Sequence, residues 1–221
     1  LRALQQRFQE AEAHYAAVCS TVGDVPASES GVDVLVYLRL GSIKCRDLKY
    51  SLARDLFITA CQVKPSATSW MRVGEALLKL EEFRDAEDAL AEANLLNVHN
   101  ASVWGNLTLL SLAMGREEEA NRSYGEATRL GLDDAELLSA VGEAFLKSGK
   151  YDQAEASLRR SLATSFGPHT LCLLGDTLRE QGLLEKAKEQ FQSVLTKFPS
   201  RQNHVDYATG CISEISAIVG N

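Results

Sequence analysis

The sequence predicts an all-α fold built from stacked pairs of helices, and two observations support this prediction. First, Leu and Ala supply 59 of the 221 residues against only 4 Pro, a composition that favours helices over strands. Second, similar residues recur at intervals of 33 or 34 positions through most of the chain. A helix–turn–helix unit of this length cannot bury its apolar face alone, so successive units are expected to stack into a solenoid.

Five consecutive units carry the repeat, with expected boundaries of 34–66, 67–100, 101–134, 135–167 and 168–200. Position 4 is Tyr, Trp or Leu, and position 8 is Gly in every unit except the third, which has Thr108. Position 20 is Ala in all units, as Ala53, Ala86, Ala120, Ala154 and Ala187. Small residues at positions 8 and 20 let the two helices approach closely, and a bulky residue at position 24 fills the space between units.

Position 15 of each unit is expected to lie in the turn between the two helices. Gly115, Gly149 and Gly182 hold this position in the last three units, where a left-handed C-cap suits glycine. Leu48 and Glu81 hold it in the first two units. We therefore expect the turns of the first two units to close in a different way.

The two ends of the chain receive separate predictions. Residues 1–22 are amphipathic, and Ala11, Tyr15 and Val18 match the offsets of a second helix, so this segment is predicted to end a truncated preceding repeat. Residues 23–33 contain Pro26, two Gly and two Ser, a composition typical of an exposed loop. Residues 201–221 resemble a lone first helix, which is expected to cover the open end of the solenoid.

Composition and charge exclude several classes of function. The net charge is −7 and the isoelectric point about 5.2, which argues against a nucleic-acid-binding surface. No apolar run has the length of a membrane span. The 5 cysteines are scattered and form no CxxC motif, so they are expected to be reduced and mostly buried. The chain begins with Leu1 and no signal-like segment, so we expect it to be part of a longer cytoplasmic protein.

The sequence also lacks the motifs of catalysis. There is no P-loop, nucleophile elbow or HExxH motif, and we expect neither enzymatic activity nor a cofactor or metal site. His169 and Cys172 share one face of a helix, but two ligands make a poor metal site. The N-x-[ST] motifs at Asn100, Asn106 and Asn121 would matter only in a secreted protein.

The repeat resembles the tetratricopeptide repeat (TPR), and the agreement covers residues 34–200. The resemblance implies a right-handed superhelical solenoid that binds proteins. A closer resemblance lies within residues 80–134, where LEEFRDAEDALAEANLLNVHNASVW is followed by GREEEANRSY. This segment resembles the C-terminal repeats of a cilia- and flagella-associated TPR family, and it includes non-consensus residues such as Asp88, Glu92 and Asn94. That resemblance implies a protein–protein interaction scaffold in the axoneme, acting with dynein arms or the central apparatus.

The TPR resemblance also implies where a protein partner would bind, because positions 2, 5, 6, 9, 12 and 13 commonly face a concave groove. The candidate partner-binding residues are Arg39, Arg46, Met71, Arg72, Glu75, Lys79, Asn106, Leu109, Leu112, Glu143, Asp176 and Arg179. The first units contribute cations and the last units contribute carboxylates, including Glu136 and Glu180. We therefore expect an extended or helical partner segment whose acidic end lies near the first two units, with an apolar anchor at Leu109 and Leu112.

Other interpretations remain open. The groove positions would otherwise form a solvated face, with the two leucines covered by the terminal helix of the chain itself. A co-chaperone type of carboxylate clamp is disfavoured, because only Asn106 matches its pattern while Glu136 and Ala140 hold positions that need cations. The domain could also be a generic cytosolic adaptor, a regulatory part of a larger protein, or a self-association module.

Overall fold

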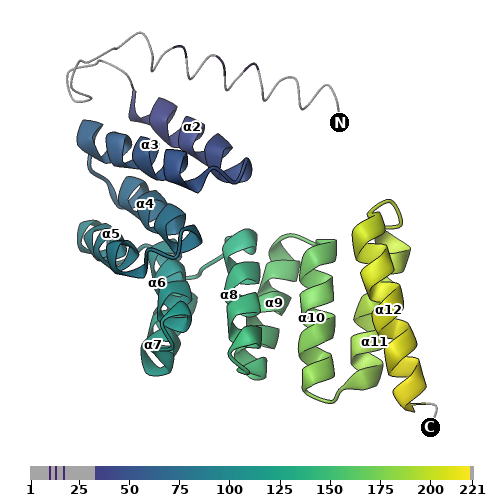
Figure 1. The fold of residues 1–221 in the computed structure, drawn as a ribbon. Coiled ribbons are helices and arrows are strands. Elements are labelled where there is room, and N and C mark those ends of the chain that lie inside the picture. Colours follow the sequence, from purple (N-terminus) through teal and green to yellow (C-terminus); the bar gives the residue numbers. More distant parts are fainter. Residues whose placement is uncertain (1–9, 11–12, 14–16, 18–32, 220–221) are drawn as a thin grey trace. The chain divides into compact units, whose positions relative to one another are not determined.

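Residues 33–219 form eleven α-helices, with no strand among them, in a computed structural model that describes residues 10, 13, 17 and 33–219 (Figure 1). The first helices of successive pairs are α2 (Val34–Arg46), α4 (Ala67–Lys79), α6 (Ala101–Ala113), α8 (Ala135–Lys147) and α10 (Pro168–Glu180). The second helices are α3 (Tyr50–Val63), α5 (Phe83–Leu96), α7 (Glu117–Arg129), α9 (Tyr151–Thr164) and α11 (Leu184–Lys197), and α12 (Gln202–Val219) follows them. The predicted all-α class is confirmed. The helix expected at 1–22 and most of the loop expected at 23–33 lie outside the described residues.

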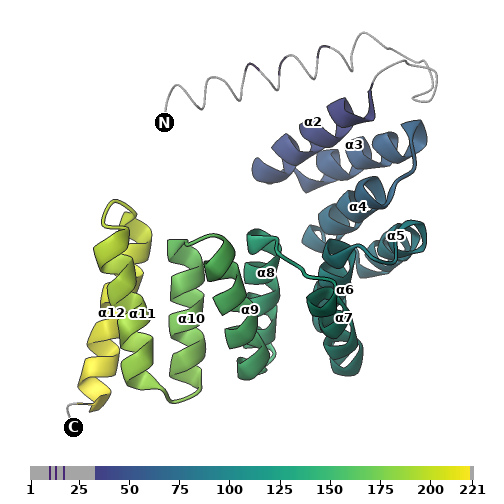
Figure 2. The same cartoon turned by 180° about the vertical axis from the view of Figure 1, so that it is seen from behind.

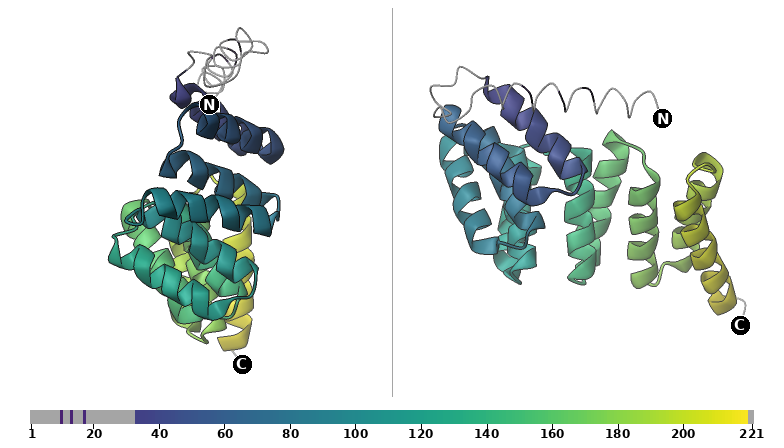
Figure 3. Two further views of the ribbon diagram at one scale, coloured as in Figure 1. Left: turned by 90° about the vertical axis from the view of Figure 1, so that its left-hand side faces the viewer. Right: turned by 45° about the horizontal axis from the view of Figure 1, so that its top comes forward.

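The chain divides into two compact units, Leu1–Leu110 and Ser111–Asn221, and each has its own packing. In the first unit, α2 packs on α3, α3 on α4 and α4 on α5, as the views in Figures 2 and 3 also show. In the second unit, the same order runs from α8 through α9, α10 and α11 to α12. Helix α12 also touches α10. A single continuous solenoid across all five repeats stays a prediction.

The first helices α2, α4 and α8 begin with side-chain caps, whereas α10 begins after Gly167 without one. Asp33 accepts a hydrogen bond from the Leu35 amide at 2.9 Å, and Asp134 accepts one from the Leu137 amide at 3.0 Å. Ser66 and Ser69 form a reciprocal capping box at the start of α4. The second helices α3, α5, α7, α9 and α11 have no side-chain cap. Their start is fixed by the preceding turn instead.

The turns inside the five pairs share one geometry, so the expectation for Leu48 and Glu81 is wrong. Leu48 has φ = 60° and Glu81 has φ = 61°, close to the values of Gly115, Gly149 and Gly182. In every turn the amide of position 15 donates to the carbonyl three residues earlier, and the next amide donates to the carbonyl five residues earlier. This is the Schellman motif, which satisfies carbonyls at the helix end with backbone donors alone. The pattern of backbone hydrogen bonds therefore overrides the preference of Leu and Glu for negative φ.

The predicted close approach of the two helices in a pair is confirmed at position 8. A Cβ atom added to Gly74 would lie 2.6 Å from Leu90 Cγ, and one added to Gly142 would lie 2.6 Å from Leu158 Cγ. In the fifth repeat, a Cβ on Gly175 would lie 2.6 Å from Phe191 Cζ. The five alanines at position 20 are all fully buried. Position 24 thus packs against position 8 of its own pair, and this contact sets the distance between the two helices.

Candidate binding surface

The first helices carry the residues that the sequence predicts for partner binding, and the structure gives them different exposures. Arg39, Arg46 and Lys79 are exposed. The half-buried members are Arg72, Glu75, Leu109, Leu112, Glu143, Asp176 and Arg179. Met71 and Asn106 are buried, with 7% and 1% of their surface exposed. Met71 and Asn106 can therefore hold neighbouring side chains in place, but they expose little surface to a partner.

In the first unit, three of the predicted residues form one polar network. The Arg72 guanidinium lies 2.7 Å from one Glu75 oxygen, and Asn106 Nδ2 donates to the other Glu75 oxygen at 3.1 Å. Asn106 Nδ2 also donates to the Ser102 carbonyl at 3.0 Å. Because Glu75 offsets the charge of Arg72, the exposed side chains of Arg39 and Lys79 contribute more to the positive charge of the first helices than Arg72 does. Asn106 links α6 to α4.

Cys45 of α2 lies in the same charged environment. Burial raises the pKa of its thiol and the charge of Glu75 adds to the rise, while Arg72 and Lys79 oppose it. The thiol therefore stays protonated and unreactive at neutral pH. Cys61, Cys172 and Cys211 are buried and free, and burial raises the pKa of each thiol. The predicted free, mostly buried cysteines are confirmed for these four, while Cys19 lies outside the described residues.

In the second unit, Asp176 and Arg179 contact the last helix. The Tyr207 hydroxyl of α12 donates to the two Asp176 oxygens at 2.8 and 2.9 Å. Arg179 lies 3.4 Å from Asp176 and 3.5 Å from Glu214 of α12. Burial raises the pKa of Asp176, whereas the Tyr207 hydrogen bond and the Arg179 charge oppose that rise. These two residues hold α12 in place, so the surface proposed below does not include them.

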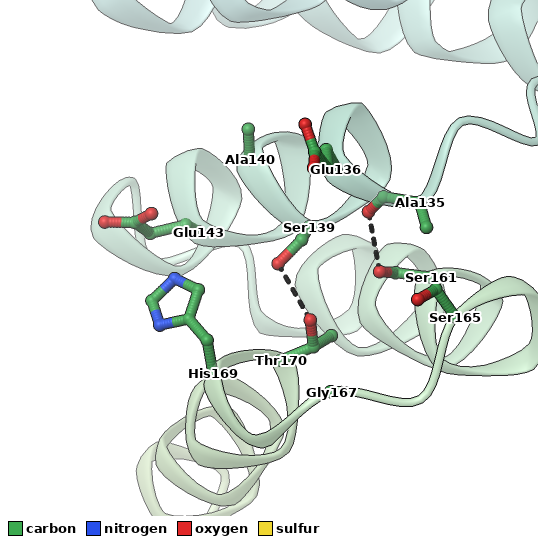
Figure 4. A pocket seen from close by; sticks show the side chains of 10 residues that line it. All are labelled: Ala135, Glu136, Ser139, Ala140, Glu143, Ser161, Ser165, Gly167, His169 and Thr170. Atoms are coloured by element: carbon green, nitrogen blue, oxygen red, sulfur yellow. Dashed lines mark hydrogen bonds between the residues drawn. The ribbon is translucent and has the colours of Figure 1, made fainter. Parts of the chain in front are cut away.

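A pocket of about 290 Å³ opens between α8, the end of α9 and the start of α10 (Figure 4). The residues that line it are Ala135, Glu136, Ser139, Ala140, Glu143, Ser161, Ser165, Gly167, His169 and Thr170. Ser139 and Thr170 share a hydrogen bond of 3.1 Å, and Ser161 Oγ donates to the Ala135 carbonyl at 2.7 Å. The first bond links α8 to α10, and the second links α9 to α8.

The pocket brings together residues at the groove positions of two repeats. They are Glu136, Ser139, Ala140 and Glu143 of the fourth repeat and His169 of the fifth. Glu143 pairs with Lys147 of its own helix at 2.7 Å, and both Glu143 and His169 line the pocket (Figure 4). The groove positions did not include five other lining residues, which are Ser161, Ser165, Gly167, Thr170 and Ala135. The first two belong to the second helix and its following loop, which the groove positions do not include, so only the folded chain reveals their place.

Other candidate chemistry finds no support in the geometry. Among the described residues, no three His, Cys, Asp or Glu side chains are grouped so that they could hold a metal ion. Asn106 of the second N-x-[ST] motif is 1% exposed, so a glycan could not be attached there in the folded chain. None of the described helices combines the length and apolar character needed to cross a membrane.

Comparison with known proteins identifies the family of the chain. The family model described as "Cilia and flagella-associated protein 70 C-terminal domain" matches residues 1–207. The chain belongs to this family. Cilia- and flagella-associated protein 70 of Homo sapiens is 40% identical over 138 residues, which are 62% of this chain and 12% of that protein. Its Macaca fascicularis counterpart is 42% identical over 106 residues, which are 48% of this chain and 10% of that protein.

Solved structures share the fold. A thermophilic TPR protein of Thermus thermophilus has a TM-score of 0.68 at 21% identity, covering 81% of this chain and 98% of its own. The APC/C hetero-tetramer Cut9–Hcn1 gives a TM-score of 0.72 at 13% identity, covering 95% of this chain and 40% of the other. YrrB, described as a TPR protein with an unusual peptide-binding site, has a TM-score of 0.51 at 16% sequence identity. The match covers 87% of this chain and 98% of the YrrB chain. The predicted TPR solenoid class is therefore confirmed, as is the family resemblance.

Proposed function

We propose that this region is a non-catalytic protein-interaction module of a ciliary or flagellar protein. The observation that carries the proposal is the pocket on α8 and α10, because positions expected to face a partner line one depression there. TPR surfaces bind other proteins through such first-helix positions. Membership of the family supports a place in the cytoskeleton of the cilium or flagellum. The matched region is about a tenth of the length of the named relatives.

The partner that fits this surface is an extended or helical segment of another protein. YrrB, whose description names a peptide-binding site, gives a precedent for a peptide ligand on this fold. Exposed Arg39, Arg46 and Lys79 in the first unit favour an acidic stretch of the partner. Half-buried Leu109 on α6 offers an apolar anchor within the first unit.

Charge reversal tests this assignment. Arg39→Glu combined with Lys79→Glu replaces two exposed cations on first helices, and the variant should lose the proteins that the unaltered chain captures from ciliated cells. Lys64→Glu combined with Arg84→Glu is the matched control, since it makes the same charge change outside the first helices. Quantitative mass spectrometry of the captured proteins is the measurement. Equal capture by both variants would reject the first-helix surface of this unit as the contact.

The cellular location needs its own experiment. The full-length protein carrying a small tag should concentrate along cilia or flagella and resist detergent extraction with the axoneme. Deletion of residues 34–200 should reduce this retention if the repeats make the anchoring contact. A uniform cytoplasmic signal for the intact protein would favour the generic adaptor instead.

A further inference from the structure

We infer that the pocket on α8 and α10 receives a basic side chain, Arg or Lys, from the partner segment. This inference rests on the proposed function and names the chemistry that one part of the surface recognises. The pocket has a volume of about 290 Å³, just below the range of about 300–1,000 Å³ that is typical of pockets for drug-sized ligands. A single long side chain with the adjoining backbone is therefore a more suitable occupant than a cofactor.

The charges around the pocket select a cation. Glu136 and Glu143 are two of the ten lining residues, and none of the ten is Lys or Arg. Glu136 is exposed and forms no ion pair with a described residue. Glu143 pairs with Lys147, but that lysine side chain is 73% exposed. An exposed pair within one helix is weak, so a ligand cation can replace Lys147 at little cost.

A buried hydroxyl pair supplies a second, uncharged contact. Ser139 and Thr170 are 8% and 7% exposed, and they share one hydrogen bond. Two hydroxyls carry two O–H donors, and one shared bond uses only one of them. The second donor belongs to a lining residue of the pocket and can bind a carbonyl oxygen (Figure 4). A peptide that places a basic side chain between the carboxylates offers such carbonyl groups in its backbone.

The shape of the site comes from its small residues. Ala135, Ala140, Ser165 and Gly167 line the pocket without filling it. An anion is the competing ligand, because Gly167 gives the start of α10 no side-chain cap. Glu136, Glu143 and the Asp134 carboxylate at the start of α8 oppose an anion, however. The net field at the pocket therefore favours a positive ligand.

Nuclear magnetic resonance of the isotope-labelled 221-residue chain tests the inference directly. The probe is acetyl-Ala-Arg-Ala-amide, and its matched control is the same peptide with citrulline, which keeps the shape and removes the charge. We expect the arginine peptide to shift the amide signals of Ser139, Ala140 and Thr170 in a saturable way. The citrulline peptide should bind at least tenfold more weakly. Equal binding of the two peptides, or no shift at these amides, would overturn the inference.

Variants complete the test. Glu136→Gln with Glu143→Gln should weaken binding of the arginine peptide at least tenfold, while Glu118→Gln with Glu189→Gln removes two exposed carboxylates elsewhere in the second unit and should leave it unchanged. Stronger binding of acetyl-Ala-Glu-Ala-amide than of the arginine peptide would establish an anion site instead. If the arginine peptide does not bind but the charge reversal in the first unit abolishes partner capture, the inference about the pocket is wrong and the proposed function is still supported.

Discussion

At the scale of the residue, Gly175 shows how one missing side chain sets a helix distance. The Phe191 ring occupies the space where a Cβ atom would lie, with Phe191 Cζ 2.6 Å from the ideal position. Phe191 is fully buried and belongs to the core of the second unit. A methyl group at this position must therefore displace a ring that has no room to move.

Gly175→Ala should lower the free energy of unfolding by about 1–3 kcal/mol, the usual cost of overpacking a close-packed core. Gly210→Ala is the matched control, because nothing lies within 4 Å of its added Cβ and alanine is the better helix former. Urea denaturation followed by circular dichroism measures both variants. A Gly175→Ala variant as stable as the unaltered chain would show that position 8 does not limit the approach of α11.

Tyr207 offers a second test at this scale, through the Asp176 carboxylate. Burial already raises the pKa of Asp176, and the hydrogen bonds from Tyr207 favour its charged form. Tyr207→Phe should therefore raise the pKa of Asp176 further and destabilise α12 by about 1–2 kcal/mol. Carboxyl chemical shifts recorded against pH measure the change, with Tyr151→Phe as the control. Because the pKa of Asp176 already lies above its ordinary value, ionisation of this group opposes folding, so the variant should lose stability as pH rises through the new pKa.

At the scale of the element, the turns decide where each second helix begins. Leu48 is 71% exposed and both it and Glu81 hold φ near 60°, which a residue with a Cβ adopts at a cost of roughly 1–2 kcal/mol. Glycine would remove that cost but lose more chain entropy on folding, about 0.5–1 kcal/mol.

Leu48→Gly and Glu81→Gly should therefore each stabilise the chain by about 0.5–1 kcal/mol net. Lys49→Gly is the control, since Lys49 has φ = −93° and gains nothing from glycine. Thermal melting of the three variants distinguishes them. If the first two melt at or below the temperature of the unaltered chain, the left-handed geometry carries no cost there.

The sequence predicted the positions of these turns but not the backbone conformation of all of them. Repeat spacing predicted the helical pairs because it reports which residues face the core, and the alanines at position 20 are buried as expected. Residue preference failed at Leu48 and Glu81, because the backbone hydrogen bonds of the Schellman turn outweigh a local cost of this size. Assigning groove positions found Glu143 of the pocket but could not foresee that Asp176 and Arg179 contact α12. Such contacts depend on how a helix outside the repeat docks, and periodicity carries no information about that.

At the scale of the whole molecule, the second compact unit completes its core with its last helix, α12. In the second unit, α12 contributes Ala208, Cys211 and Ile215 to the cluster that contains Leu174 and Phe191. All three residues from α12 are buried. The helix therefore covers apolar side chains of α10 and α11 that would otherwise meet water.

Ile215→Ala should destabilise the second unit by about 2–4 kcal/mol, the cost of losing a buried aliphatic side chain and leaving a cavity. Ile218→Ala is the matched control, because Ile218 is 61% exposed. Hydrogen exchange read by mass spectrometry should show faster exchange in α10 and α11 of the first variant. Unchanged protection in those helices would mean that α12 is not needed for the core beneath it.

The distribution of glycine among the turns predicts which compact unit unfolds first. Among the residues that the structure describes, the two left-handed residues with side chains, Leu48 and Glu81, lie in the first unit, whereas Gly115, Gly149 and Gly182 belong to turns of the second. At about 0.5–1 kcal/mol net for each residue relative to glycine, Leu48 and Glu81 cost the first unit about 1–2 kcal/mol of stability that the glycine turns of the second unit do not lose. Opening should therefore start among α2 to α5, and protease cleavage under native conditions should begin there. On this prediction the two units unfold at different rates, and the pocket on α8 and α10 lies in the unit that stays folded longer.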